Sequence, residues 1–324
     1  MQRVLAATSV VALASLPLIA RFDRDFAWQR VAVDAAHVPV FALLAIVLHV
    51  WLRREQTDAP PAQPLLVAFL AAQAVGVLVE LLQVWGGRSA SAFDLGSNAA
   101  GAALGLALTA AAQGRGRGVS SRACRVPAWL VLAAAAGFVY AVWRPVEAVL
   151  AYQRRAAIVP QLVRFEDARD LYFVRTAPAA ARIEALPTEF ARRAGERALR
   201  VPYGDAVAPE VELLEPWPDW RGHVSLAIEL ANDGPQDLPL VLRIHDADHD
   251  WSAEDRLNLP VVVPAHARTT LRVPLARLRS APHERPMDLG RIANLKLFGA
   301  GGIGDGALYL LSARLEQPGS APEL

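Results

Sequence analysis

The chain has 324 residues, a formal net charge of +1 and 54% hydrophobic residues, with a mean hydropathy of +0.26. This composition is too apolar for an ordinary soluble protein of that length. Positive and negative residues are nearly balanced in number, and no basic patch stands out in the sequence. This argues against a nucleic-acid partner. Cys124 is the single cysteine, so no intrachain disulfide can form.

Five apolar runs before residue 145 are each about as long as the roughly 20 residues that cross a bilayer. Tryptophans stand at or near the ends of these runs, as expected for side chains at the lipid headgroups. We therefore predict five transmembrane helices in a domain of residues 1–145. The first run also fits a signal peptide, but no clear small-x-small cleavage site precedes Arg21, which favours a retained helix. The runs are 4–20, 35–52, 64–85, 95–112 and 127–143.

Arginines are more numerous in the loops on the side of the N-terminus. The positive-inside rule then places the N-terminus in the cytoplasm. With five spans, the residues after 145 lie outside the inner (plasma) membrane of a bacterium, in a periplasmic or extracellular domain.

Polar residues cluster at the ends of the apolar runs, where ionisable side chains are costly unless they face each other or water. Spacings of three and four place each pair on one helical face, and the predicted orientation brings the pairs together at the outer surface. The cluster comprises Asp34, His37, Glu80, Gln83, Arg88, Asp94 and Asn98.

Small residues recur at every fourth position of the fourth run, at Ser97, Gly101 and Gly105. Such a repeat lets a neighbouring helix approach closely. We expect this helix to press against the helix that carries Glu80.

The ordered series of these residues is similar to the VanZ-like membrane domain, over residues 30–110. The sequence departs from the family at Ala35 and Val38, where a lysine and an aromatic residue are frequent. The family is named for a glycopeptide-resistance protein, and the resemblance implies a cell-envelope or polysaccharide function without supplying a reaction. The series is Asp34-x-x-His37, Glu80-x-x-Gln83, Arg88 and Asp94-x-x-x-Asn98-x-x-Gly101-x-x-x-Gly105.

Three interpretations of the polar cluster stay open. Arg88 and the helix start at Asp94 fit a site for an anionic group such as a lipid-linked phosphate. His37, oriented by Asp34 or Glu80, fits a general base, and these three side chains are also conceivable metal ligands without diagnostic spacing. The third interpretation is a purely structural set of ion pairs and interhelical hydrogen bonds.

The pattern changes after a connector at 146–159. Apolar residues alternate with polar ones at 224–230 and 271–275, which is typical of half-buried strands. The sequence Asn232-Asp233-Gly234-Pro235 predicts a turn. We predict a soluble all-β sandwich of jelly-roll type over residues 160–318, a short helix at 289–295 and a disordered tail at 319–324. Further strands are expected at 162–165, 181–186, 198–203, 210–214, 238–244 and 307–316.

The strand order, with the sequences around Trp220, His245 and Asp255, resembles galactose-binding-like sandwiches, which include many carbohydrate-binding modules. This resemblance implies that an exposed loop or concave face holds a sugar. Core packing is an equal explanation for a sandwich tryptophan. The residues expected to contact a glycan are Trp220, His245, Asp246, His249, Trp251, Asp255, Arg256 and Asn258.

Two metal sites are also considered in this half. His245 and His249 are four residues apart, but they leave a strand for a loop and need not converge. A structural calcium ion, which such sandwiches often carry, would find ligands in Glu166 and Asp167. No other cofactor is expected.

The sequence lacks a nucleophile elbow, a phosphate loop and a zinc-protease helix. We predict a membrane protein that contacts the lipid bilayer and binds or scaffolds envelope glycans, or lipid-linked glycan precursors, at the outer face. The alternative is a membrane enzyme that acts on a lipid-linked substrate through His37, Glu80 and Arg88.

Overall fold

The computed structural model describes residues 26–55, 60, 62–85, 92–115, 127–178, 180–299 and 304–319. The chain divides into two compact units, residues 1–149 and 150–324. The first predicted span at 4–20, Arg88 and residues 320–324 of the expected tail lie outside the described residues.

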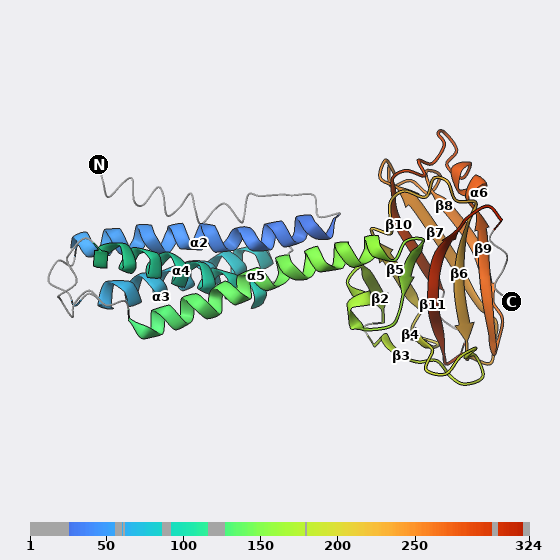
Figure 1. Cartoon of the computed structure of the whole chain (residues 1–324), viewed down its shortest axis with the longest axis horizontal. Helices are drawn as coiled ribbons and strands as arrows, with labels where there is room; N and C mark the ends of the chain where they lie inside the picture. Colours follow the sequence, from blue (N-terminus) through green and yellow to red (C-terminus); the bar gives the residue numbers. More distant parts are fainter. Residues whose placement is uncertain are drawn as a thin grey trace. The chain divides into compact units, whose positions relative to one another are not determined.

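The first unit is helical, and its four described long helices are each apolar and long enough to cross a membrane (Figure 1). Their outward surface is apolar too, with Trp85, Leu132 and Trp143 among the most exposed side chains. Such a surface suits lipid rather than water. The four helices are α2 (Ala27–Glu55), α3 (Ala62–Trp85), α4 (Ala92–Arg115) and α5 (Ala128–Ala157).

Glycines bring α2 and α4 into close contact. A Cβ atom on Gly105 would lie 2.5 Å from the carbonyl oxygen of Ala42, and one on Gly101 would collide with the carbonyl oxygen of Val38. Gly101 and Gly105 of the predicted small-residue repeat therefore face α2 rather than the helix of Glu80, although α4 contacts that helix as well. In α3, Gly76 instead leaves room for the amide of Asn98.

The connector predicted at 146–159 is mostly helical, because α5 continues through Pro145 to Ala157. The helix-forming residues between Val146 and Ala157 explain this continuation. From residue 150 onward the chain belongs to the second unit. There Arg155 donates a 2.5 Å hydrogen bond to the carbonyl oxygen of Glu215.

The second unit is a sandwich of two antiparallel sheets that face each other (Figure 1). The first sheet has the order β3-β4-β11-β6-β9, with β1 also paired to β11, and the second has the order β2-β5-β10-β7-β8. Their strands are β1 (Gln161–Arg164), β2 (Val174–Ala177), β3 (Arg182–Ala185), β4 (Arg197–Tyr203), β5 (Glu210–Leu214), β6 (Ser225–Asn232), β7 (Leu238–Asp246), β8 (Leu257–Val263), β9 (Ala267–Pro274), β10 (Ile292–Gly299) and β11 (Gly306–Glu316).

The helix predicted at 289–295 is wrong, since β10 begins at Ile292. The pairing of β10 with β7 shifts between Ile292 and Asn294. This bulge puts Ile292 and Leu295 into the same core although they are three residues apart, a spacing that looks helical in the sequence. A short helix occurs instead at α6 (Leu275–Arg279).

Apolar side chains from both sheets meet in one core between them. Trp220 is fully buried there, together with Leu199, Ile228 and Leu242. A smaller apolar cluster, which includes Phe190, Tyr309 and Leu311, covers part of the other face of the first sheet. The rest of that face is polar.

Candidate functional site

A pocket opens on the outer face of the first sheet, where β11 changes partners. β11 pairs with β4 up to Leu310 and with β1 from Ser312. Its pairing with β6 on the other edge shifts register at the same place, so Leu311 is a bulge residue. The gap between the ends of β4 and β1 leaves space that no strand fills.

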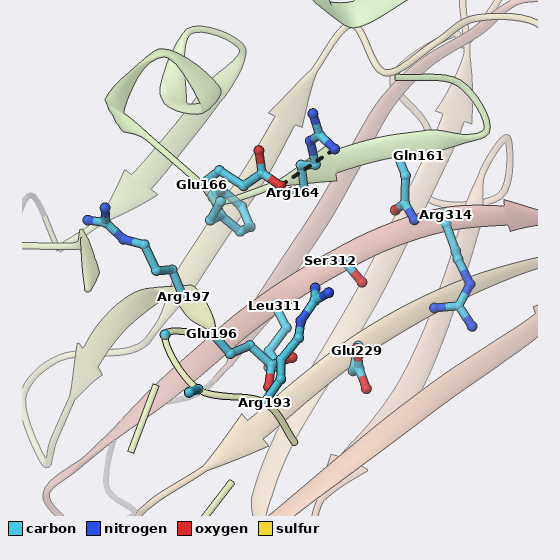
Figure 2. A pocket seen from close by; sticks show the side chains of 13 residues that line it. Gln161, Arg164, Glu166, Arg193, Glu196, Arg197, Glu229, Leu311, Ser312 and Arg314 are labelled. Atoms are coloured by element: carbon cyan, nitrogen blue, oxygen red, sulfur yellow. Dashed lines mark ion pairs between the residues drawn. The ribbon is translucent and has the colours of Figure 1, made fainter. Parts of the chain in front are cut away.

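The pocket has a volume of about 460 Å³, which is within the usual range for small-molecule sites. Charged side chains surround it, and Phe165, its aromatic lining residue, is only 2% exposed. Figure 2 shows the Arg193 side chain extending toward the centre of the group, whereas Arg197 points away. The polar lining residues are Gln161, Arg164, Glu166, Arg193, Glu196, Arg197, Glu229, Ser312 and Arg314.

A buried arginine holds two of the pocket carboxylates. Arg268 on β9 donates hydrogen bonds of 2.8 and 2.9 Å to the two oxygens of Glu196, and its Nη2 lies 2.9 Å from Oε1 of Glu229. Hydrogen bonds from Arg268 lower the pKa of Glu196. Arg192 lies 3.3 Å from the same oxygen of Glu229. These carboxylates are therefore neutralised by arginines outside the lining.

A second candidate surface lies at the loop between β7 and β8, where the sequence predicted glycan contacts. Trp251 is 76% exposed and has a positive φ of 72°, which is unusual for a bulky residue. Its ring centroid lies 5.5 Å from that of His249 and 6.2 Å from that of His245. The His249 side chain is only 2% exposed and supports the loop rather than meeting a ligand. We call Trp251 and His245 the Trp251 surface.

Hydrogen bonds brace the loop on both sides of Trp251. The backbone nitrogen of Asp250 donates to Oδ2 of Asp255 at 3.0 Å, and that of Ser252 donates to Oδ1 of Asp250 at 2.8 Å. His249 Nδ1 donates to the carbonyl oxygen of Asp255 at 2.9 Å. The exposed indole is thus held on an ordered support.

Arg285 ties the base of this loop to the sheet. It binds both oxygens of the buried Asp246 at 2.6 and 2.7 Å and Oδ2 of Asp255 at 2.8 Å. Burial opposes ionisation of Asp246, but the bonds from Arg285 and from the Asp288 amide outweigh it and lower the pKa. Asp246 therefore supports the loop and is too buried to meet a ligand.

Both histidines use Nδ1 within the protein. His245 Nδ1 lies 2.9 Å from the carbonyl oxygen of Asp246, so the neutral ring donates through Nδ1 and leaves Nε2 as an acceptor. Burial lowers the pKa of His245 and favours this neutral form. The Nε2 atom of His245 can accept a hydrogen bond from a hydroxyl group.

Potential metal-ligand atoms of His249, Asp250 and Asp255 lie within 4.8 Å of one another. However, Asp255 Oδ2 already accepts from Arg285 and from the Asp250 amide. A guanidinium group at this oxygen disfavours a cation. The arrangement fits a hydrogen-bond network better than a metal site.

Trp220 is fully buried and donates from Nε1 to the carbonyl oxygen of Trp217 at 2.6 Å, so its predicted sugar contact is wrong. Asn258 is exposed on β8 and accepts a 3.1 Å hydrogen bond from Arg243. Arg256 is half-buried, and its Nε has no hydrogen-bond partner in the described part of the chain. Neither Asn258 nor Arg256 has a ring contact with Trp251.

The predicted calcium ligands have other partners. Asp167 caps a short 3-10 helix, η2 (Ala168–Leu171), and its carboxylate lies 3.3 Å from Arg154. Glu166 pairs with Arg164 at 3.5 Å. Within the described ranges these two residues join no group of metal-ligating side chains.

In the helical unit, most of the predicted polar cluster is buried. His37 Nδ1 lies 2.9 Å from Oδ1 of Asn98, which connects α2 to α4. Asp34 pairs with Arg144 of α5 at 2.9 Å, and the Arg144 guanidinium lies 3.7 Å from the centre of the Phe93 ring. Arg144 was not expected there, because the sequence placed it beyond the last span. The other buried members are Glu80, Gln83 and Asp94.

These contacts fit the structural interpretation of the cluster. The binding interpretation needs Arg88, which lies outside the described residues. It stays a prediction, as does the enzymatic interpretation.

Sequence reasoning missed most of the pocket. Its residues come from β1, β4, β6, β11 and the loop before β4, and no short motif contains them. The sequence around Arg193 and Gly195 gives only a weak signal for this pocket, namely a charged loop that contains a glycine. Gly195 has a φ of +75°.

No protein-family model matches the chain, and no curated protein matches it. The VanZ-like resemblance of the helices therefore also stays a prediction.

Solved structures of low identity are similar to about half of the chain. They include a family 11 carbohydrate-binding module from Clostridium thermocellum in complex with a mixed-linked tetrasaccharide, with 12% identity, a TM-score of 0.34 and coverage of 48% of this chain and 94% of that one. A cellulose-specific module, CBM28, has 12% identity, a TM-score of 0.35 and coverage of 49% and 93%. An exo-beta-agarase has 15% identity and a TM-score of 0.39, over 50% of this chain; the match spans only a quarter of the agarase.

Proposed function

We propose that the protein is a glycan-binding protein of the bacterial cell envelope, anchored in the inner membrane by its helical unit. In this proposal the N-terminus is cytoplasmic, and the sandwich binds envelope glycans, or the glycan part of lipid-linked precursors, outside the membrane. The four described apolar helices support the anchor. The arginine distribution in the loops supports the orientation.

One observation carries the proposal: Trp251 is strongly exposed on a braced loop. The braced loop presents the apolar face of this indole to solvent, where another molecule can pack on it. Indole rings stack on the apolar faces of sugars, and the neighbouring His245 offers an acceptor for a hydroxyl group. Together they provide the apolar platform and the directional contact that a sugar ring requires.

Purified full-length protein in detergent should be tested on an array of envelope polysaccharides and peptidoglycan fragments. We expect a subset of glycans to be retained by the wild type and by Trp251→Phe but lost with Trp251→Ala. Val262→Ala is the matched control, because Val262 is 57% exposed on β8 and lies outside the Trp251 surface. Binding by the wild type that is unchanged in Trp251→Ala would contradict the role of this surface, and no binding would contradict the function.

A further inference from the structure

The pocket on the first sheet, which is separate from the Trp251 surface, contains more guanidinium groups than free carboxylates. Glu196 and Glu229 are paired with Arg268, whose side chain is 9% exposed, and Glu229 is also paired with Arg192. Glu166 pairs with Arg164 across 3.5 Å at the surface, a distance and exposure at which an ion pair is weak. The pocket therefore presents a positive surface to solvent.

Arg193 is the central cation of this surface. It is exposed, no ion pair or hydrogen bond of its side chain is found among the described residues, and Figure 2 shows it extending toward the middle of the pocket residues. Its neighbour Arg192 is instead turned to Glu229. The backbone amide of Arg192 donates to Glu196 at 2.9 Å, which fixes the loop that carries Arg193.

Arg314 and Ser312 complete the site on β11. Among the described residues the ion-pair partner of Arg314 is Glu316 at 3.3 Å, which also accepts from Ser225 and Arg272. A carboxylate or phosphate would offer Arg314 a stronger, bidentate partner. Ser312 adds a hydroxyl group that can donate to the same anion.

The lining also indicates what kind of molecule carries the anion. Phe165 is buried, so the pocket offers no ring for stacking on a neutral sugar. It also offers no apolar rim for an acyl chain, because its surface residues are mostly charged. A hydrophilic chain that bears carboxylates meets both conditions.

We propose that this pocket binds an acidic glycan through a sugar carboxylate held by Arg193 and Arg314. The assignment does not depend on Trp251. It adds a second contact to the proposed function and defines the chemical class of the glycan as one that contains uronic acids.

The test is calorimetric titration of the full-length protein in detergent with an oligogalacturonate and with its methyl ester of the same length. We expect the acid to bind, the ester to bind at least about tenfold more weakly, and Arg193→Ala or Arg314→Ala to lower the affinity for the acid by about tenfold or more. Arg221→Ala removes the same charge from an exposed arginine outside the pocket and should leave binding unchanged. Added salt should weaken binding of the acid.

Equal affinities for acid and ester, or binding of the acid that neither pocket variant weakens, would overturn the inference. Neutral glycans would still bind through Trp251 in that case, so the proposed function would be judged separately. Titration with inorganic phosphate and with phosphatidylglycerol vesicles tests other anions. Arginine-dependent binding of either one that is as tight as binding of the acid would also overturn the assignment to a glycan.

Discussion

Arg268 on β9 binds both carboxylate oxygens of Glu196 beside the start of β4, with hydrogen bonds of 2.8 and 2.9 Å. The two side chains are 9% and 11% exposed. The pair joins the edge strand β9 to the loop that carries Arg193, and Glu196 of this pair lines the pocket. The position of the pocket arginines thus depends on an ion pair that is shielded from solvent.

Replacing Arg268 with methionine should destabilise the sandwich strongly, because Glu196 and Glu229 would remain poorly solvated without their partner. We expect a loss of about 3 kcal/mol in the free energy of unfolding, measured by denaturant titration of tryptophan fluorescence. The matched control is Arg272→Met on the same strand, whose partner Glu316 lies at 3.3 Å and whose own side chain is 41% exposed. A loss below about 1 kcal/mol is expected there. Equal losses in the two variants would contradict the role given to Arg268.

The same pair predicts how stability depends on pH. Because Arg268 lowers the pKa of Glu196 below its ordinary value of 4.5, the unfolded chain takes up a proton first as the pH falls. The stabilisation is complete above pH 4.5 and is lost as the pH falls through the lower pKa of the folded state. Glu196→Gln should flatten this part of the stability profile, measured by thermal unfolding as the pH is lowered from neutral through and below 4.5. A profile as steep as that of the wild type would show that Glu196 does not contribute.

The tryptophans of the sandwich should separate stability from binding. Trp220→Ala removes a fully buried side chain from the core and should cost about 3–5 kcal/mol of unfolding free energy. Trp251→Ala removes an exposed ring and should change stability by no more than about 0.5 kcal/mol. Chemical denaturation of the two variants tests both values. A large loss of stability with Trp251→Ala would mean that the indole supports the loop rather than a ligand.

Close contact between α2 and α4 should make Gly101 intolerant of any larger residue. A Cβ atom there collides with the backbone of Val38, so Gly101→Leu must force the helices apart. We expect a lower melting temperature and a lower yield of monodisperse protein in detergent. Ala112→Leu adds similar volume at an exposed position of the same helix and should be tolerated. Equal behaviour of the two variants would contradict the observed packing of α2 against α4.

The sequence predicted the elements whose signal is local. Apolar length identified the four described helices, and alternation identified the strands β6 and β9. It failed where pairing between distant segments decides the outcome. Ile292 and Leu295 are three residues apart and looked helical, but a bulge in β10 brings both into the core. β8 was overlooked because Asn258 and Pro260 interrupt its apolar residues.

The candidate functional sites also divide into residues that a local sequence pattern predicts and residues that only distant pairing brings together. The sequence predicted a sugar contact for both Trp251 and Trp220. Only the structure separates them, because Trp251 is exposed and Trp220 is buried. The pocket depends on the exchange of partners along β11 at Leu311, which no local pattern encodes. Arg144 was missed because the predicted span ended at residue 143, whereas α5 continues to Ala157 and places Arg144 on the helix, where it pairs with Asp34.

Glycan binding through Trp251 is tested most directly by calorimetric titration. The full-length wild type and Trp251→Ala are each titrated with the glycan that binds best on the array. We predict saturable binding by the wild type and at least a tenfold weaker affinity for the variant, which is about 1.4 kcal/mol, with unfolding free energies that match within about 0.5 kcal/mol. Equal affinity of the two proteins, or no heat of binding for any glycan, would contradict the claim that the sandwich binds a sugar through its exposed tryptophan.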